Sequence, residues 1–168
     1  MQKTIISILV ISLFIGLGAC KKEETGSVEG IKVGNMAPEF TLPDVNDNNR
    51  SLSDYKGKLV LVAFWASWCP YCKEENPVLV MLHNAYQHNG FEILAVSLDT
   101  QKNKWMEGIA NENLTYDHVS DLKGFDSPVA GLYNVGNIPQ MFLIDENGII
   151  ILITNDAYDV ATLVEQQY

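Results

Sequence analysis

The chain has 168 residues, of which 47% are hydrophobic and 19% are charged, and its formal net charge is −10. This composition is typical of one globular domain that is long enough to bury a core without a framework of disulfide bonds. Lysine and arginine form no continuous basic stretch, so we expect no nucleic-acid partner. No internal repeat or low-complexity segment divides the chain.

The N-terminus has the pattern of an export signal. Lys3 is followed by an apolar stretch over residues 5–17, which is too short to span a membrane and has the length of a signal-peptide core. The sequence Leu17-Gly18-Ala19-Cys20 resembles the bacterial lipobox, and this resemblance implies cleavage before Cys20 and lipid attachment to its thiol. The alternative is an ordinary cleaved signal peptide in which Cys20 has no role.

These features divide the chain into three parts. We expect a lipoprotein signal peptide (1–19), a flexible tether (20–30) and a folded domain (31–168). The tether is rich in Gly, Ser and Glu, a composition that favours flexible linkers. Several acyl chains on Cys20 would give stable anchoring. The expected location is therefore extracytoplasmic, lipid-anchored to a bacterial membrane at the periplasmic face or the cell surface.

The first part of the folded domain predicts a hairpin followed by a strand and a helix. Residues 36–43 alternate apolar and polar side chains, and the Asn and Asp residues of 46–49 tolerate a left-handed backbone, so the chain can return through 50–52. The continuous apolar stretch 59–65 predicts a strand buried on both faces. A helical stretch through about residue 89 follows the cysteine pair.

The rest of the chain alternates strands and helices. In order, the patterns predict a strand over 91–98, a helix over 102–113, a short strand over 116–119, a short helix over 127–133, a strand over 141–145, a returning strand over 149–154 and a helix over 160–167. Asn147-Gly148 is a strong hairpin signal between the last two strands. This order predicts an α/β fold with a layered sheet and helices on both faces.

Cys69-Pro70-Tyr71-Cys72 lies where the first buried strand ends and the helix begins. Pro70 would take the first helical position, where its missing N–H costs nothing. Cys69 would then cap the helix, and the free N–H groups and positive end of the helix favour a thiolate. A thiolate is the species that attacks a disulfide, and Cys72 is close enough to close one. A C-x-x-C beside a βαβ pattern therefore predicts thioredoxin-like redox chemistry.

A structural disulfide and a metal site are weaker alternatives for the cysteine pair. A structural disulfide in so short a loop would constrain little of the unfolded chain. A zinc site usually has four ligands, and the chain has no second cysteine pair. His83, His88 and His118 are not at ligand spacing, and we expect His83 on the helix surface. We therefore predict no metal and no cofactor.

Three blocks of the sequence occur in the order found in one known family. Residues 65–77 (WASWCPYCKEENP), 33–42 (VGNMAPEFTL) and 136–145 (GNIPQMFLID) resemble the active-site block, the opening segment and the cis-proline loop of TlpA/ResA thiol–disulfide oxidoreductases. The opening segment is also similar to that of peroxiredoxins of the AhpC/TSA type. The resemblance implies a thioredoxin-like fold, with a central mixed β-sheet flanked by helices and an N-terminal β-hairpin extension.

The resemblance also implies roles for individual residues. Cys69 corresponds to the attacking cysteine and Cys72 to the resolving cysteine of one redox-active disulfide. The Ile138–Pro139 peptide bond would be cis and face the sulfurs, where its backbone could pair with an extended substrate segment. A plain proline at a strand start is the alternative for Pro139. The expected substrate-binding residues are Trp68, Tyr71, Ile138 and Pro139.

The proton chemistry is expected at Glu75. Thioredoxins carry a carboxylate in the strand before the cysteines, but Ala63 stands at that position. The ResA-like group has a glutamate three residues after the second cysteine, and Glu75 matches it. We predict that Glu75 is a catalytic general acid/base for Cys72. A solvated helix residue is the alternative.

The sequence therefore predicts a monomeric enzyme that reduces disulfides of exported proteins through a mixed disulfide on Cys69. Its expected partners are exported cysteine-containing proteins, a membrane electron donor or acceptor, and the membrane that holds the lipid anchor. The Pro-Tyr pair between the cysteines leaves the direction of electron flow open.

Two other functions remain as alternatives. A thiol peroxidase would need a threonine where Ala66 stands, and an arginine partner, while Arg50 is the chain's single arginine. A Cu(I)- or apoprotein-binding chaperone would use the two thiols as ligands without catalysis.

Overall fold

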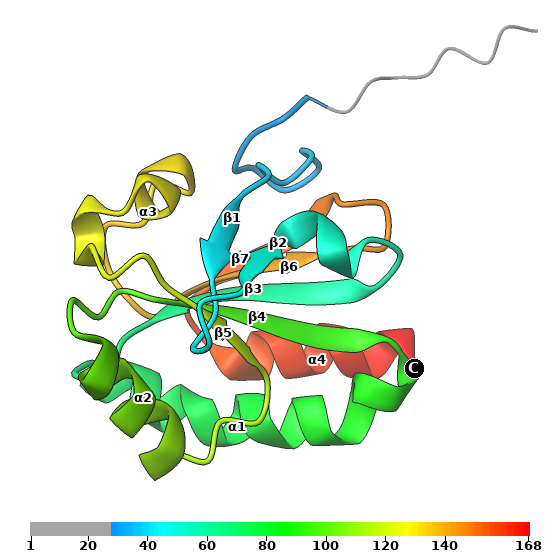
Figure 1. Cartoon of the computed structure of the whole chain (residues 1–168). Coiled ribbons are helices and arrows are strands. Elements are labelled where there is room, and N and C mark those ends of the chain that lie inside the picture. Colours follow the sequence, from blue (N-terminus) through cyan, green and yellow to red (C-terminus); the bar gives the residue numbers. More distant parts are fainter. Residues whose placement is uncertain (1–27) are drawn as a thin grey trace, which may run out of the picture.

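The computed structural model describes residues 28–168, so the predicted signal peptide and Cys20 lie outside the described residues. Its strands form a five-stranded sheet in the order β5-β4-β3-β6-β7 and a separate two-stranded sheet of β1 and β2 (Figure 1). The strands are β1 (Thr41–Pro43), β2 (Asn49–Ser51), β3 (Leu59–Trp65), β4 (Phe91–Ser97), β5 (Asp117–Val119), β6 (Gln140–Ile144) and β7 (Ile150–Thr154). The helices are α1 (Pro70–Tyr86), α2 (Lys102–Asn111), α3 (Pro128–Leu132) and α4 (Ala157–Gln167), with 3₁₀ turns η1 (Leu52–Tyr55), η2 (Gln87–Asn89) and η3 (Gly124–Asp126).

The central strand β3 is buried along its whole length, as its continuous apolar sequence predicts. It pairs in parallel with β4 and antiparallel with β6, and β4 pairs in parallel with β5. The predicted mixed sheet is thus confirmed. Because β3, β4 and β5 run in the same direction, their carboxyl ends meet at one edge of the sheet. This edge carries Cys69 shortly after β3 and Asp99 shortly after β4.

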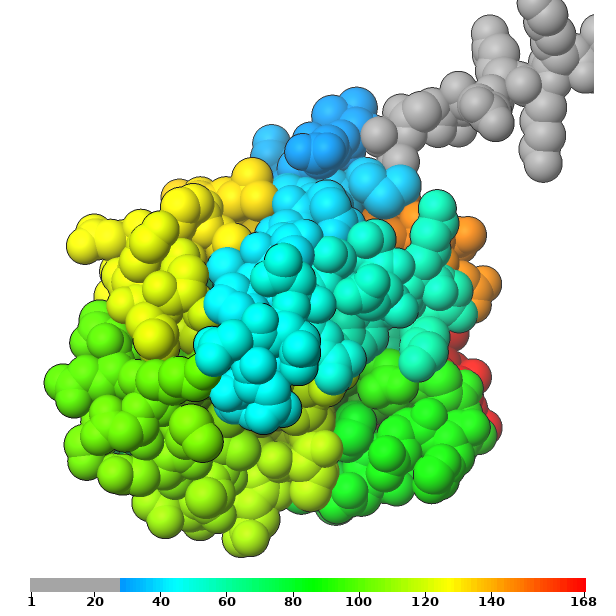
Figure 2. Space-filling view, in the orientation of Figure 1, coloured from blue at the N-terminus to red at the C-terminus, as the bar shows by residue number. Residues whose placement is uncertain are grey.

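The two faces of the sheet are covered differently. Helices α1 and α4 pack against each other across one face, and the β1–β2 hairpin lies on the opposite side together with α3 (Figure 1). In the space-filling view the hairpin and η1 form the middle of the visible surface (Figure 2). An aromatic cluster fills the space beneath this side, in which the rings of Phe40, Phe64 and Phe142 pack around Tyr133. The Tyr133 hydroxyl donates to the carbonyl oxygen of Pro38, 2.7 Å away.

The N-terminal segment before β1 is tied to the turn and strand at the far edge of the sheet. The Ala37 N–H donates to the Gly148 carbonyl at 2.9 Å, and the Gly34 N–H donates to the Ile150 carbonyl at 2.8 Å. The Ile150 N–H donates in return to the Asn35 carbonyl at 2.9 Å. The segment therefore extends the β6–β7 hairpin at the end of the sheet that lies away from Cys69.

Among the helices, one end of α1 and one end of α4 differ most from the sequence prediction. Helix α1 ends at Tyr86, and the last predicted turn is the 3₁₀ turn η2. Helix α4 begins at Ala157, before its predicted start at residue 160, because the Asp156 carboxylate caps it by accepting the Tyr158 N–H at 2.8 Å. None of the helices within residues 28–168 combines the length and the apolar character that a membrane span requires.

The prediction that His83 lies at the surface is wrong. His83 is only 5% exposed, and its ring packs edge-on against Tyr116. Its Nε2 atom lies 3.5 Å from a carboxylate oxygen of Glu92 on β4. Eleven residues are just over three helical turns, so His83 lies on the same face of α1 as the buried Cys72.

Candidate active site

Cys69 occupies the N-cap of α1, and Pro70 takes the first helical position. A disulfide joins Cys69 to Cys72, with the two Cα atoms 5.3 Å apart. The backbone N–H of Cys72 lies 3.1 Å from the Cys69 sulfur. After reduction of the disulfide, this N–H and the positive helix end both stabilise a thiolate on Cys69. The predicted capping geometry is therefore confirmed.

The loop before β6 forms the wall next to the sulfur. The Ile138–Pro139 peptide bond is cis, as the family resemblance implies. The carbonyl oxygen of Ile138 lies 3.7 Å from the Cys69 sulfur. Both cysteines are buried, with 2% of the surface of Cys69 and 1% of that of Cys72 exposed.

Aromatic side chains are exposed around the cysteines. Trp68 is 54% exposed and Tyr71 is 69% exposed, whereas Trp65 is buried in the core. The Trp68 ring lies 6.3 Å, between centroids, from the ring of Phe125 in η3. Sequence reasoning did not single out Phe125, because it is distant in the chain and η3 has no strong pattern.

The Glu75 carboxylate contacts the start of another helix. Its Oε2 atom accepts the backbone N–H of Ala157, the first residue of α4, at 2.6 Å. The positive end of α4 thus faces the carboxylate. Sequence reasoning selected Glu75 but did not predict this contact.

Two hollows share Glu75 as a lining residue. A small cavity of about 10 Å³ lies beside Cys72 and is also lined by Ala63 and Pro139. An open surface hollow of about 380 Å³ is lined by Tyr71, Glu75, Asn137, Ile138, Pro139 and Asn155. Glu75 therefore lies between the interior next to Cys72 and the surface next to the cis-proline loop.

Polar side chains also line the small cavity beside Cys72 or lie next to it. The Asn76 side-chain amide donates to the Glu112 carboxylate, and the Tyr116 hydroxyl lies 3.5 Å from the Asn76 amide oxygen. Burial, and secondarily the Glu112 charge, raise the pKa of the Tyr116 hydroxyl. The His118 ring stacks on Tyr116, and burial lowers its pKa to about 3, so this histidine is neutral at physiological pH.

A buried carboxylate lies at the edge of the sheet that carries Cys69. Asp99 follows β4 and is bonded to Ser67, two residues before Cys69. Sequence reasoning missed this pair. An acidic residue directly after a buried parallel strand, at the same sheet edge as the cysteine motif, is the signal that could have revealed it.

The arginine that a thiol peroxidase would need is paired elsewhere. Arg50 pairs with Asp44 and Asp117, at 3.6 and 3.5 Å, in the region of β2 and β5. Its guanidinium is therefore engaged with carboxylates and is not paired with Cys69. In residues 28–168, no three His, Cys, Asp or Glu side chains are grouped to hold a metal ion.

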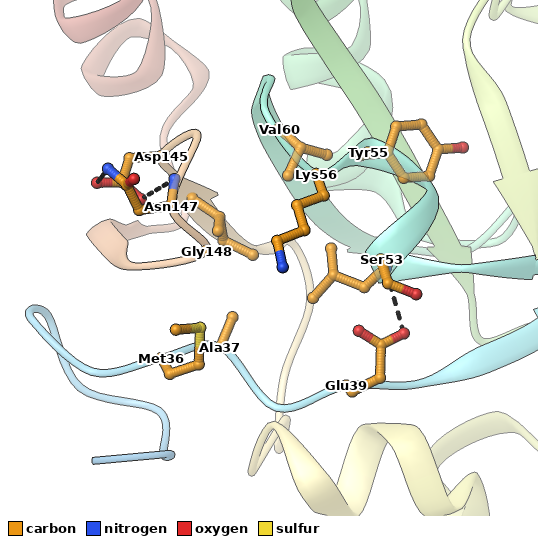
Figure 3. Close-up of a pocket in the computed structure, with 12 residues that line it drawn as sticks. Met36, Ala37, Glu39, Ser53, Tyr55, Lys56, Val60, Asp145, Asn147 and Gly148 are labelled. Atoms are coloured by element: carbon orange, nitrogen blue, oxygen red, sulfur yellow. Dashed lines mark hydrogen bonds between the residues drawn. The ribbon is translucent and has the colours of Figure 1, made fainter. Parts of the chain in front are cut away.

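The molecule has another pocket at the opposite end of β3. It lies between the N-terminal segment, η1 and the β6–β7 turn, and its lining includes Met36, Val60 and Gly148 (Figure 3). A hydrogen bond from the Ser53 N–H to the Glu39 carboxylate closes one side of it. Val60 lies near the start of β3 and Cys69 follows its end, so this pocket is separate from the redox centre.

The fold and the disulfide at the N-cap of α1 together define a thioredoxin-like redox protein. Residues 33–153 match the AhpC/TSA family. Thiol-disulfide oxidoreductase ResA of Geobacillus kaustophilus is 39% identical over 118 residues, which cover 70% of this chain and 66% of the relative. ResA of Oceanobacillus iheyensis is 33% identical over 160 residues, covering 93% of this chain and 80% of the relative.

The solved structures that are similar to this chain are thiol-disulfide oxidoreductases as well. The thioredoxin domain of a thiol-disulfide oxidoreductase from Bacteroides vulgatus has a TM-score of 0.76 and 32% identity, and the match covers 82% of this chain and 99% of that structure. The chain therefore belongs to the AhpC/TSA family, within its ResA-like group of thiol–disulfide oxidoreductases. It spans 66% of the length of the Geobacillus relative. The predicted family and thioredoxin-like fold are both confirmed.

Proposed function

We propose that this protein reduces disulfide bonds of exported proteins by dithiol–disulfide exchange at Cys69 and Cys72. The observation that carries the proposal is the position of the disulfide: one sulfur caps a helix and faces the carbonyl oxygen of Ile138. Such a site stabilises the thiolate needed for attack and offers an adjacent backbone edge for a substrate.

The reaction begins with the reduced dithiol. The Cys69 thiolate attacks one sulfur of the substrate disulfide, the substrate S–S bond breaks, and the other substrate sulfur leaves as a thiolate that takes up a proton. Cys72 then loses its proton and attacks the Cys69 sulfur of the mixed disulfide. The Cys69–Cys72 disulfide forms, and the second substrate sulfur leaves as a thiolate. Two electrons have passed from the enzyme to the substrate.

Glu75 is the group that accepts the proton of Cys72 in the second step. Its side chain lines the small cavity beside Cys72 as well as the open hollow at the surface. A carboxylate in that position can take a proton from the buried thiol and pass it to solvent. No other acidic residue lines the small cavity among the described residues.

The substrate lies along the cis-proline loop, between exposed aromatic side chains. The backbone of Ile138 and Pro139 would pair with an extended segment of the substrate. The rings of Trp68 and Tyr71, which are largely exposed, supply apolar contact area at low entropic cost.

We propose further that the protein acts outside the cytoplasm on a lipid anchor at Cys20. The lipobox-like sequence Leu17-Gly18-Ala19-Cys20 supports this part of the proposal. Mass spectrometry of the mature N-terminus tests it. Removal of residues 1–19 together with acyl mass on Cys20 is the expected result, and an unmodified Cys20 thiol would contradict the anchor.

Trapping of mixed disulfides tests the exchange reaction. A Cys72→Ser variant lacks the resolving thiol, so substrates should accumulate as mixed disulfides on Cys69 that a reducing agent releases. The matched Cys69→Ser variant should trap none. If the Cys72→Ser variant traps no exported protein, the proposed function is wrong. It is also wrong if the natural sequence binds Cu(I) tightly and shows no disulfide-exchange activity.

The reduction potential of the cysteine pair tests the direction of electron flow. A reductase is expected near about −270 mV, the value of thioredoxin, and a value near about −120 mV would make the protein an oxidant. Equilibration of the Cys69–Cys72 pair with glutathione buffers gives this potential directly. A membrane donor must then supply electrons to the oxidised form, because the compartment itself is oxidising.

A further inference from the structure

We propose that Asp99 is a positioning residue of the redox centre, which fixes the turn that leads into Cys69. The inference rests on the proposed function, since it assumes that Cys69 is the attacking group. It concerns a residue outside the C-x-x-C motif and outside the cis-proline loop.

Asp99 is almost completely buried, with 1% of its surface exposed, and its carboxylate is surrounded by donors. One oxygen accepts the Ser67 hydroxyl at 2.7 Å. The other accepts the Ser67 backbone N–H at 3.0 Å and the Ser97 hydroxyl at 2.8 Å. A buried carboxylate is tolerated where it is hydrogen-bonded in this way, and such charge-assisted bonds are stronger than neutral ones.

These bonds hold Ser67 on both its side chain and its backbone, and Ser67 is close to the reacting sulfur along the chain. The Cys69 N–H donates to the Ala66 carbonyl at 3.0 Å, which closes the turn that contains Ser67. Because this hydrogen bond closes a short turn, the position of Ser67 determines the position of Cys69. From there α1 begins, and the sulfur meets the Cys72 N–H.

Helix α2 holds Ser67 from another direction. A Cβ atom on Gly108 would lie 2.7 Å from the Ser67 Cβ and 3.2 Å from its Cα, so only glycine lets α2 approach this closely. Ser67 is thus held between the carboxylate of Asp99 and the backbone of α2. The bonds to Asp99 and the close approach of α2 restrict movement of the turn, and so hold Cys69 in place against the helix N-terminus and the Ile138 carbonyl.

The test compares Asp99→Ala with Asp99→Asn. Alanine removes every bond to Ser67, whereas asparagine keeps an oxygen for the Ser67 N–H and has nearly the same shape. The measurement is the rate constant at which the reduced protein attacks a disulfide substrate, expressed per folded molecule. Because small misplacements of a reacting group are costly, we expect Asp99→Ala to lower this rate about tenfold, and Asp99→Asn to restore most of it.

The matched control is Asp145→Ala. The Asp145 carboxylate also holds a turn, by accepting the N–H groups of Asn147 and Ile149 at 2.9 and 2.8 Å, but at the far end of the sheet. Its loss should lower the free energy of unfolding and leave the attack rate per folded molecule unchanged. If Asp99→Ala does not fold, Ser67→Ala, which keeps the backbone bond, should lower the rate by a smaller factor.

The outcomes separate the two proposals. If the natural sequence attacks no disulfide, the proposed function fails. If it does attack, the inference about Asp99 is overturned when folded Asp99→Ala, or Ser67→Ala in its place, attacks at the natural rate. It is also overturned when Asp99→Asn is as slow as Asp99→Ala, because the negative charge, and not the position of Ser67, would then be the cause.

Discussion

At the scale of single residues, the bond of Glu75 to α4 can be separated from its proposed proton transfer with Cys72. In Glu75→Gln the side-chain oxygen can still accept the Ala157 N–H, but the carboxylate that we propose takes the Cys72 proton is lost. We expect disulfide exchange to slow by about 100-fold, the usual contribution of a general acid/base, with a changed pH dependence and an intact fold. Stopped-flow measurement of the exchange rate between pH 5 and 9 checks this.

Two variants complete that test. Glu75→Ala also leaves the buried Ala157 N–H without its partner, so it should cost a further 1–3 kcal/mol or so in the free energy of unfolding. Glu74→Gln, a neighbouring exposed position on α1, should change neither the rate nor the stability. A pH–rate profile of Glu75→Gln that matches the natural one would show that Glu75 only supports α4.

His118 should make the fold sensitive to acid. Its pKa is about 3 in the folded protein because it is buried, against about 6.5 in an unfolded chain. Between these two values the unfolded state binds a proton that the folded state does not, so stability falls as the pH is lowered, by up to ~1.4 kcal/mol per pH unit. In His118→Phe the ring can still pack against Tyr116 and Trp65 without titrating.

Urea unfolding at pH 4.5 and pH 7 measures this effect. The difference in unfolding free energy between the two pH values should shrink by roughly 2–3 kcal/mol in His118→Phe. Substitution of the exposed His88 by Gln should leave the difference as it is. An equal pH difference in His118→Phe and in the natural sequence would mean that His118 is protonated, or accessible, in the folded protein.

At the scale of elements, two helical glycines should respond to alanine in opposite directions. Alanine is the better helix former by about 1 kcal/mol. At Gly131 in α3 nothing lies within 4 Å of the added Cβ, so Gly131→Ala should stabilise the protein by up to about 1 kcal/mol. At Gly108 in α2 the added Cβ would collide with Ser67, so Gly108→Ala should destabilise it by about 1–3 kcal/mol.

Melting temperatures of both variants decide this prediction. Gly108→Ala should also slow disulfide exchange, because α2 or the turn before Cys69 has to move. If both variants are more stable than the natural sequence, α2 does not pack closely against Ser67.

Elements with a strong local pattern could be predicted from the sequence. The apolar stretches predicted β3 and β4 with nearly their observed ends. Asn147-Gly148 correctly predicted the hairpin between β6 and β7. The start of α4 was placed late because its apolar pattern begins at Val160, although Asp156 is itself a capping residue that indicates the true start. His83 was misplaced because histidine occurs both buried and exposed, so its residue type carries no clear sign of burial.

At the scale of the whole molecule, contacts between distant segments could not be predicted. Glu75 and Ala157 are 82 residues apart, and Ser67 and Asp99 are 32 apart. These contacts depend on which strands are neighbours and on the side of the sheet that each helix covers. The cysteine pair and the cis-proline loop could be predicted, because each is a short motif that can be recognised in the sequence without knowledge of the strand order.

The N-terminal segment before β1 decides where the folded domain begins. The sequence places its start near Ile31, yet the Gly30 N–H donates to the Met36 carbonyl and the Met36 N–H to the Val28 carbonyl, both at 3.0 Å. A chain that begins at Ile31 should therefore lose about 1 kcal/mol relative to one that begins at Val28, since exposed hydrogen bonds are worth little.

A chain that begins at Ala37 should lose about 2–4 kcal/mol, because it also lacks the two bonds to Ile150 and the packing of Met36. Urea unfolding of the three chains measures these differences. The rate of disulfide exchange should be equal in all three, because the segment lies at the end of the sheet away from Cys69. Equal stability of the chains from Val28 and Ala37 would mean that the segment is a linker, and that the domain begins after it.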